Sequence, residues 1–452
     1  MAERDWTRQA TAIVGPGNWT AETELRARGW QDDLPKLLVY PDNREQICEL
    51  MRLANAERLR VAPAGGLTKQ RMGGNAQPID LVVSLRRLNR ITDYQAADLT
   101  VSVEAGVPFK ELEGTLRTRG QMLPLDVPFA AEATVGGVLA TNSSGPRRVA
   151  YGSARDMVLG AHFVTAEGKL AKSGGKVVKN VAGYDLTKLL IGSFGTLGIL
   201  TDATFRAYPI PPASLTLGFG FSTIQSALEA RNRILRSPFA PQALEVSDSA
   251  TGTLLNERAL ASTPFTLLVR TAGPEAVIER ARRELPSLAS ADGLETTFCL
   301  TGEEESELWD KVRELTPRFL SAQSEGAVVK VSALLTQMGP VIAAASRAAS
   351  NHGLRSATLA RAGTGIVYCY LWPSSENRGD TSGNRVAGAC GLLLQETSHL
   401  GGRAIIEWAT AEVKKKVNIW GPPGDDFTVM QRIKAAWDPQ GILNPGRFYG
   451  GI

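Results

Sequence analysis

The chain has 452 residues, of which 43% are hydrophobic and 21% charged, and its formal net charge is +4. This length predicts two or three domains, each large enough to form its own core. The small net charge, without a dense Lys/Arg stripe interleaved with aromatic residues, excludes a nucleic-acid-binding protein.

Cysteine usage and the N-terminus predict the cellular compartment. Cys48, Cys299, Cys369 and Cys390 lie far apart, so a cysteine-ligated iron–sulfur cluster and a zinc ribbon are excluded within this chain. Isolated thiols and a polar N-terminus without an apolar signal region predict a cytoplasmic protein. Because no run of about 18 apolar residues occurs, no membrane-spanning segment is expected. Peripheral attachment to the inner membrane through a partner stays open.

The first half of the chain predicts short alternating elements. Residues 1–34 are expected to form a helical lead, and a first domain is expected over residues 35–212. Short apolar runs predict strands, and apolar residues at helical spacing predict helices. The expected elements are strands at 37–40, 60–63, 81–84 and 99–103, and helices over 43–56 and 108–119.

Pro209, Pro211 and Pro212 mark the end of the first domain. A second α+β domain is expected over residues 213–425, with helices over 226–235 and 274–285. The tail, residues 426–452, is expected to begin with a helix through Trp437. We expect this tail to return to the first domain.

The first motif with chemical content is Pro63-Ala64-Gly65-Gly66-Leu67-Thr68. Paired glycines allow successive backbone N–H groups to converge, which suits a phosphate or pyrophosphate. An ordinary glycine-rich turn is the alternative. The fingerprints of P-loop nucleotide hydrolases and of nicotinamide-binding domains are both absent.

Three further motifs are rich in small residues. Residues 133–145 consist mostly of Gly, Ala, Ser and Thr, which favours either backbone wrapped around a flat ligand or tight helix packing. The segments 151–160 and 174–200 contain several glycines, and each alone is typical of turns.

Together the four motifs resemble the FAD-binding domain of vanillyl-alcohol-oxidase-type flavoproteins. Within that superfamily, the chain is most similar to the FAD-binding subunits of bacterial glycolate oxidases. The strings that carry this likeness are Gly120–Pro124, Gly145–Arg148, Lys179–Leu186 and Asn444–Phe448. The resemblance implies an α+β fold: a two-part FAD-binding domain of the vanillyl-alcohol-oxidase (PCMH) type, a second α+β domain, and a tail that packs on the first.

The resemblance also implies roles for individual positions. The backbone of residues 64–68 would hold the pyrophosphate, Asn142 and Gly145 would run beside the flavin, and Ile199 would meet the adenine end. The complete expected set is Pro63, Ala64, Gly65, Gly66, Leu67, Thr68, Asp126, Thr134, Gly136, Gly137, Asn142, Gly145, Gly152, Gly198 and Ile199.

The chain departs from relatives that tether flavin or bind metal. Residues 63–74 contain neither His nor Cys, so we expect non-covalent FAD. The three histidines, His162, His352 and His399, are expected in loops or on the surface, and no metal site is expected.

The candidates for substrate chemistry come from residue type alone. Tyr368 and Tyr370 are candidate bases, and Arg361, Arg403 and Lys330 are candidate partners of a substrate carboxylate. For each of them an ordinary structural role is the alternative.

The function that the resemblance implies is a subunit of a glycolate oxidase complex. This complex would oxidise glycolate, a small 2-hydroxy acid, to glyoxylate. A second flavin subunit and an iron–sulfur subunit are the expected partners. One alternative is a stand-alone FAD-dependent oxidase or dehydrogenase of another hydroxy acid or alcohol. The other is an FAD-binding assembly subunit without turnover.

Overall fold

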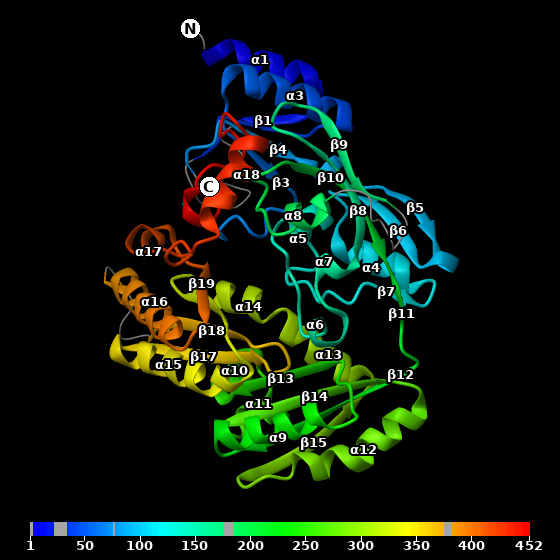
Figure 1. Ribbon diagram of the computed structural model, residues 1–452, viewed down its shortest axis with the longest axis vertical. Helices are drawn as coiled ribbons and strands as arrows, with labels where there is room; N and C mark the ends of the chain where they lie inside the picture. The colour runs from blue at the N-terminus through cyan, green and yellow to red at the C-terminus, as the bar shows by residue number, and fades with distance from the viewer. Residues whose placement is uncertain (1–2, 22–33, 76, 176–183, 375–378, 380) are drawn as a thin grey trace.

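The computed structural model describes residues 3–21, 34–75, 77–175, 184–374, 379 and 381–452. Two lobes are stacked along the long axis of the molecule, and the chain first crosses between them after β11 (Figure 1). Both lobes mix helices and sheets, which confirms the predicted α+β class. Residues 22–33 of the expected helical lead and residues 176–183 of the fourth motif lie outside the described residues.

A small, mostly parallel sheet forms the N-terminal part of the first lobe. Its strand order is β1-β2-β4-β3, and β2 and β3 both run parallel to β4. Trp6 and Leu50 of the two covering helices share a core with Val61 and Val83 of the sheet. The elements are β1 Trp19–Ala21, β2 Leu37–Val39, β3 Val61–Ala64, β4 Leu81–Ser84, α1 Glu3–Val14 and α3 Arg44–Glu57.

The N-terminal segment differs from the expected helical lead. α1 ends at Val14, and Gly15 and Gly17 then adopt positive φ values, which glycine does without strain. The chain reverses there, and β1 pairs antiparallel with β2, Trp19 facing Val39. The lead is therefore a helix followed by an edge strand.

The second sheet of the first lobe is antiparallel, with strand order β5-β6-β10-β8-β9. Phe109 and Val138 of its covering helices meet Val101, Phe163 and Phe205 in one core. Its strands are β5 Ile91–Gln95, β6 Thr100–Glu104, β8 Val158–Val164, β9 Leu170–Gly174 and β10 Ile199–Arg206, beside the ribbon of β7 Gln121–Met122 and β11 Tyr208–Pro209. The helices are α4 Phe109–Arg117, α5 Val135–Ala140, α6 Arg148–Tyr151, α7 Ala154–Met157 and α8 Leu186–Leu190.

The second lobe is built on an eight-stranded antiparallel sheet of order β15-β12-β14-β13-β17-β18-β16-β19. Its strands are β12 Ala213–Phe221, β13 Ala243–Asp248, β14 Phe265–Gly273, β15 Leu294–Thr301, β16 Ala327–Ser332, β17 Leu354–Arg361, β18 Ile366–Pro373 and β19 Arg403–Trp408. Its helices are α9 Ile224–Arg236, α10 Ser249–Leu255, α11 Arg258–Ala261, α12 Glu275–Ala289, α13 Gly302–Arg313, α14 Leu315–Ala322, α15 Met338–Asn351, α16 Ser382–His399 and α17 Ala411–Lys416.

The two faces of this sheet have different neighbours. Alternate side chains of a strand point to opposite faces, and Val367 and Cys369 of β18 join the core with α9, α12, α15 and α16. Tyr368 and Tyr370 join the other core, with α10, α13 and α14. Figure 1 shows α13 and α14 between the sheet and the first lobe. Every second residue of β18 therefore faces the boundary between the lobes.

The C-terminal tail returns to the first lobe, as its place beside β3 and β4 in Figure 1 shows. α18 Phe427–Trp437 stacks the Trp437 ring on Phe163 at 5.5 Å between centroids. Beyond it, Leu443 forms a parallel bridge with Val61. The tail thus extends the small sheet at the end of β3, where the first glycine-rich motif begins.

Most predicted elements are present at nearly the predicted bounds. The structure contains them as β2, β3, β4, β6, α3, α4, α9, α12 and α18. The expected division at residues 212/213 coincides with the start of β12 at Ala213.

Candidate active site

The first glycine-rich loop follows β3 and turns at Leu67, whose φ is 61°. A Cβ added to Gly65 would overlap the Thr134 hydroxyl, and one added to Gly66 would overlap the backbone carbonyl of Glu132. We expected these glycines to leave room for a phosphate. The structure shows that the space beside their Cα atoms is filled by the chain itself, so tight packing requires both glycines.

The second small-residue motif begins α5 beside this loop. Its N-cap, Thr134, accepts a hydrogen bond from the backbone N–H of Gly137 at 3.4 Å. A Cβ on Gly136 would lie only 2.9 Å from the Cβ of Ala105, so this glycine serves helix packing. Around Gly137 the only atom near an added Cβ is that same Thr134 hydroxyl. The motif therefore packs on one side and is open on the other.

The loop and α5 line two adjoining pockets, which we call the glycine-rich cleft. The two pockets share Pro63, Ala64, Gly65, Thr134, Gly137, Ala140 and Phe194. Of the residues predicted to contact FAD, the cleft is lined by Pro63, Ala64, Gly65, Gly66, Leu67, Thr68, Thr134, Gly136, Gly137 and Gly198. Segments from three distant parts of the sequence thus meet around one elongated space.

The C-terminal tail closes one side of the glycine-rich cleft. Asn444 donates from Nδ2 to the carbonyl of Phe194 at 2.6 Å, and Arg447 donates to the carbonyls of Lys69, at 3.1 Å, and Gln70. Two amide oxygens, Oδ1 of Asn444 and Oδ1 of Asn142, are buried without a hydrogen-bond partner. Buried acceptors of this kind need a donor. The hydroxyl-bearing chain of a dinucleotide cofactor supplies such donors, so the cleft fits FAD.

The remaining residues predicted to contact FAD lie around the cleft rather than in its lining. Asn142 has a φ of 48°, and a Cβ on Gly145 would overlap the Cβ of Asp126. These three residues lie toward the second lobe. Gly152 caps α6 with a φ of 80°, and the Ile199 side chain is fully buried in the core of the small sheet. For all the residues of the expected set, contact with the cofactor stays a prediction.

Lys69 lies at the junction between this cleft and a second cavity. It is the residue that lines both spaces. Its Nζ donates to the Thr141 hydroxyl at 3.0 Å and to the Ser143 hydroxyl. Burial lowers the pKa of Lys69 to about 7, Glu407 opposes this shift, and Lys330 adds to it. Sequence reasoning missed this residue, although it directly follows the glycine-rich motif.

The second space, which we call the cap cavity, lies between the first lobe and the face of the sheet that carries Tyr368 and Tyr370. Its lining combines side chains of both lobes: Lys69, Met72, Asp126, Pro128, Ser143, Ser144, Val312, Arg313, Thr316, Lys330, Leu359, Arg361, Tyr368, Tyr370, Glu407 and Trp408. Four of the five predicted catalytic candidates therefore meet in one cavity, namely Lys330, Arg361, Tyr368 and Tyr370.

Two cations flank Tyr368 in the cap cavity. Lys330 Nζ lies 5.8 Å and the Arg361 guanidinium carbon 5.0 Å from the centre of its ring. Lys330 also lies 3.6 Å from the Glu407 carboxylate, and Arg361 lies 3.5 Å from Glu245. The pKa of Lys330 is raised, mainly by Tyr368 and then by Glu407, against the effect of burial. Burial lowers the pKa of Arg361, but Tyr368 and Glu245 outweigh it, so both groups stay cationic.

Glu245 is a buried acid behind Arg361. Neither of its carboxylate oxygens has a hydrogen-bond partner, and burial raises the pKa of Glu245 to about 8, although Arg361 lowers it. Glu245 and Glu407 both lie in strands, and no sequence motif marks either of them.

Two of the predicted candidates, one expected as a base and one as a carboxylate partner, fit these expected roles less well. The Tyr370 hydroxyl shares a hydrogen bond of 3.0 Å with Thr316, and burial raises the pKa of Tyr370, which disfavours it as a base. Arg403 lies at the start of β19, where its guanidinium carbon is 4.6 Å from the Tyr449 ring centre. The structure does not bring Arg403 into the cap cavity.

The histidines lie apart from both cavities. His399 ends α16 and is exposed, as expected, whereas His162 lies in a strand, β8, where it is half-buried and 2.6 Å from Asp202. Within the described part of the chain, no three His, Cys, Asp or Glu side chains are grouped so that they could hold a metal ion.

Comparison with known proteins identifies both lobes. Residues 35–174 match the FAD binding domain family, and residues 210–448 match the C-terminal domain of FAD linked oxidases. The chain is 26% identical to glycolate oxidase subunit GlcD of Bacillus subtilis over 99% of this chain and 97% of that protein. It is 45% identical to glycolate oxidase subunit GlcE of Escherichia coli over 28% of this chain and 37% of that protein.

The chain is also similar to two proteins that act on other substrates. A mitochondrial D-lactate dehydrogenase [cytochrome] of Arabidopsis thaliana is 27% identical over 92% of this chain and 73% of its own length. The crystal structure of p-cresol methylhydroxylase superposes with a TM-score of 0.81, covers 99% of this chain and 97% of its own, and is 16% identical, which shows a shared fold. The chain belongs to the FAD-linked oxidases, and FAD is its cofactor.

Proposed function

We propose that this FAD-linked oxidase oxidises a small 2-hydroxy acid, specifically glycolate, to the 2-oxo acid. One observation carries the proposal. Lys330 and Arg361 flank Tyr368 in a cavity that Lys69 connects to the glycine-rich cleft. Cations suited to a carboxylate therefore lie next to the space that fits the cofactor.

The glycine-rich cleft would hold the pyrophosphate of FAD through the backbone of residues 64–68 and the open side of α5. Asn142, Gly145 and Asp126 would follow the cofactor toward the cap cavity. When bound, FAD supplies the acceptor for the hydride that leaves the substrate carbon. No His or Cys lies among the described residues that line the two cavities, which supports non-covalent binding.

The substrate carboxylate would bind between Lys330 and Arg361. Arginine offers two parallel donors to a carboxylate, and lysine adds a point charge. Tyr368, Tyr370 and Trp408 wall the cavity with large rings, which favours a short acid over a bulky one. This fit supports a two- or three-carbon hydroxy acid.

Lys69 would accept the hydroxyl proton. A base works best when its pKa lies near the working pH, and burial lowers the pKa of Lys69 to about 7. The hydroxyls of Thr141 and Ser143 hold the amine beside the cap cavity. We prefer Lys69 to Tyr370, because burial shifts the pKa of that phenol away from neutrality.

Anaerobic mixing tests this proposal. The purified yellow protein is mixed with glycolate, D-lactate or D-2-hydroxyglutarate, and flavin absorbance near its visible maximum is followed in a stopped-flow instrument. We expect glycolate to bleach the flavin fastest. Faster bleaching by D-lactate would reassign the substrate, and a flavin that none of the three acids reduces would contradict the proposal.

We also propose that the chain works as a subunit, with a second flavin subunit and an iron–sulfur subunit as partners. Its similarity to both GlcD and GlcE supports this arrangement, and its scattered cysteines leave onward electron transfer to a partner. Among the described helices none is both long and apolar enough to cross a bilayer. We therefore assign any membrane attachment to partners, with the complex on the cytoplasmic side.

Co-purification from the native cells tests the complex. We expect a tagged chain to bring with it a second flavoprotein and a protein with iron–sulfur absorbance. A chain that is isolated alone and oxidises glycolate at the full cellular rate would instead be a stand-alone enzyme.

A further inference from the structure

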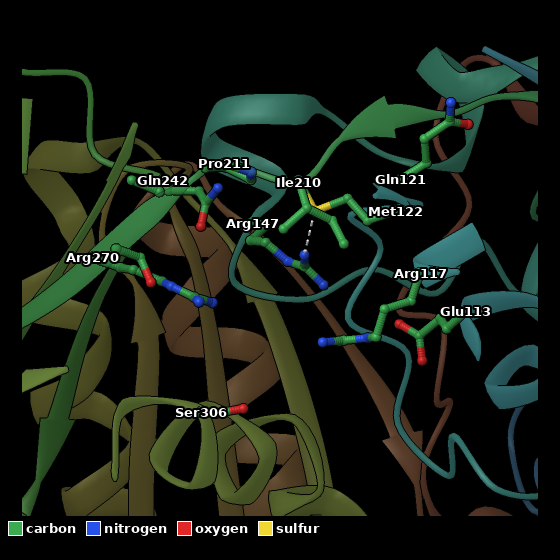
Figure 2. A pocket seen from close by; sticks show the side chains of 12 residues that line it. Glu113, Arg117, Gln121, Met122, Arg147, Ile210, Pro211, Gln242, Arg270 and Ser306 are labelled. Atoms are coloured by element: carbon green, nitrogen blue, oxygen red, sulfur yellow. Dashed lines mark hydrogen bonds between the residues drawn. The ribbon is translucent and has the colours of Figure 1, made fainter. Parts of the chain in front are cut away.

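A third cavity, at the boundary of the lobes, is lined by three arginines. Arg117 ends α4, Arg147 precedes α6, and Arg270 lies on β14 of the second lobe. Figure 2 shows Arg117 and Arg270 pointing into the cavity from opposite sides, with Arg147 between them. The remaining lining is Glu113, Gln121, Met122, Ile210, Pro211, Ser214, Gln242, Ala272 and Ser306.

Each of the three guanidinium groups has N–H donors that do not reach an oxygen acceptor in the described protein. The side chain of Arg117, an exposed residue, has no hydrogen bond or ion pair with any residue that the structure describes. Arg147 contacts Asp126 through Nε at 2.6 Å and through Nη2 at 2.5 Å, but its Nη1 reaches only the sulfur of Met122, a weak acceptor, at 3.2 Å (Figure 2). Nε of Arg270 is ion-paired with Glu305, and its two Nη groups form no hydrogen bond with the residues that the structure describes.

The nearby acids do not saturate these donors. Glu305 is ion-paired with Nε of Arg270 at 3.2 Å and also accepts hydrogen bonds from Ser214 and Thr216, so it engages one of the donors of Arg270. Glu113, the acidic residue of the cavity lining, forms no ion pair with any of the three arginines; burial raises the pKa of its carboxyl, and nearby Arg313 and Arg147 oppose this shift. Burial also lowers the pKa of Arg270, and nearby Arg147 adds to this shift, while Glu305 opposes it.

Cationic side chains from two lobes therefore line one partly open space. The cavity volume is about 160 Å³, well above the roughly 15 Å³ that one water molecule needs. Unused donors of arginine, brought together from separate elements, suit the oxygens of a carboxylate or phosphate, which guanidinium binds through paired hydrogen bonds. An anion placed here would satisfy these donors and offset the repulsion between Arg147 and Arg270.

We propose that this space, the arginine cavity, binds a small oxyanion bearing a carboxylate or phosphate group and thereby joins the two lobes. The arginine cavity and the cap cavity share no lining residue. Arg147 is linked to that cavity through Asp126, which lines it. Binding of the anion would therefore hold the wall of the cap cavity in place. This inference does not depend on which hydroxy acid is the substrate.

Isothermal titration of the FAD-loaded protein tests the site. Inorganic phosphate and glyoxylate are the two probes, each titrated in chloride buffer of matched ionic strength. Because glyoxylate is also the product of the proposed reaction, it is titrated into the Lys330→Met variant, whose cap cavity lacks one carboxylate partner. We expect saturable one-to-one binding of at least one probe and a rise of the unfolding midpoint with its concentration. Binding of phosphate alone identifies a phosphate site, and binding of glyoxylate identifies a carboxylate site.

Variants locate the binding. Arg117→Gln is expected to weaken it roughly tenfold or more, because a hydrogen-bonded charge is lost. Arg117→Lys should have an intermediate affinity, since it keeps the charge and loses the paired donors. Arg119→Gln is the matched control: Arg119 is exposed, lies two residues further along and does not line the cavity. Lys330→Met, which changes the cap cavity, should leave the affinity unchanged.

Two outcomes would overturn the proposal. One is the lack of any saturable signal beyond the effect of chloride. The other is wild-type affinity in Arg117→Gln and in Arg270→Lys, which probes the opposite lobe. If instead Lys330→Met abolishes binding and Arg117→Gln does not, the anion occupies the cap cavity and the arginine cavity has no ligand of its own. Because none of these readouts measures turnover, a failure of the proposed glycolate oxidation would leave the test intact.

Discussion

The glycine-rich cleft and the cap cavity meet at Lys69, yet they are built from different parts of the polypeptide. The cleft is lined mainly by backbone and small side chains, from contiguous loops of the first lobe and from the tail. The cap cavity is lined by charged and aromatic side chains that project from neighbouring strands of the second lobe.

This difference separates the expected effects of substitution. In the cleft, any added side chain disturbs the chain itself, so cofactor binding and local packing should fail together. In the cap cavity, a side chain can be shortened without moving the backbone, so chemistry should fail while the flavin stays bound. The predictions below test that separation, beginning with the largest expected effect.

Lys330→Met should slow flavin reduction by glycolate the most. Removing one charged partner of a buried anion costs about 2–4 kcal/mol, roughly a 30- to 1,000-fold loss of kcat/KM. The flavin content of the purified protein should stay normal. Arg403→Met is the control, because Arg403 lies outside the cap cavity and should not affect the rate. Stopped-flow reduction of both variants makes the comparison, and an unchanged rate in Lys330→Met would remove this residue from the site.

Gly66→Ala should lose FAD. Its Cβ would overlap the carbonyl of Glu132, and overpacking of this kind costs about 1–3 kcal/mol, which weakens cofactor binding roughly 5- to 150-fold. The ratio of flavin to protein absorbance measures the loss. Gly114→Ala, in α4 of the same lobe, places its Cβ in open space and should retain the cofactor. Full flavin content in Gly66→Ala would show that the loop can move away from residues 132–134.

Lys69 should give the reaction its pH dependence. A base must be unprotonated to accept the hydroxyl proton, and the pKa of Lys69 is lowered to about 7 by burial. The rate of flavin reduction should therefore rise about tenfold per pH unit below 7 and level off above it. In Lys69→Met the rate should be low and independent of pH over this range. A rise that persists in Lys69→Met would assign the proton to another group, with Tyr368 as the next candidate.

Glu314→Ala should have the smallest effect, and on stability rather than chemistry. The Glu314 carboxylate, between α13 and α14, accepts hydrogen bonds from the backbone N–H groups of Phe129 at 2.9 Å and Ala130 at 3.1 Å, which links the lobes. Its loss should destabilise the protein by about 1–2 kcal/mol. Thermal unfolding measures the change, with exposed Glu307→Ala on α13 as the control. Equal midpoints for the two variants would show that this link carries no stability.

The FAD-binding half of the site was accessible to sequence reasoning because its contacts are local. The residues within each stretch, 63–68 and 134–137, are consecutive in the chain, and each stretch consists largely of small residues. The physical reason expected for the paired glycines, room for a phosphate, was incomplete. Gly65 and Gly66 are required because a side chain there would overlap residues 132–134. The order of small residues predicted the place of the cleft, but not which atoms fill the space beside each glycine.

For the substrate-binding half of the site, the sequence indicated only which residue types could take part in the chemistry. Four of the five candidates meet in the cap cavity, while Arg403, on the same sheet, faces Tyr449 instead. Lys69 and Glu407 went unnoticed because no pattern links them, although Glu407 influences the pKa of Lys69. Their meeting depends on how the two lobes pack.

The sequence by itself predicted an α+β chain, because strand and helix periodicities are properties of neighbouring residues, and its resemblance to vanillyl-alcohol-oxidase-type flavoproteins implied the FAD cleft. Only the tertiary structure decided which charges share a cavity. Strand register placed Lys330, Arg361 and Tyr368 on one face of the sheet, and lobe packing brought Lys69 to them and set Arg117 and Arg147 opposite Arg270. These side chains come from distant segments, so no local pattern could have placed them together.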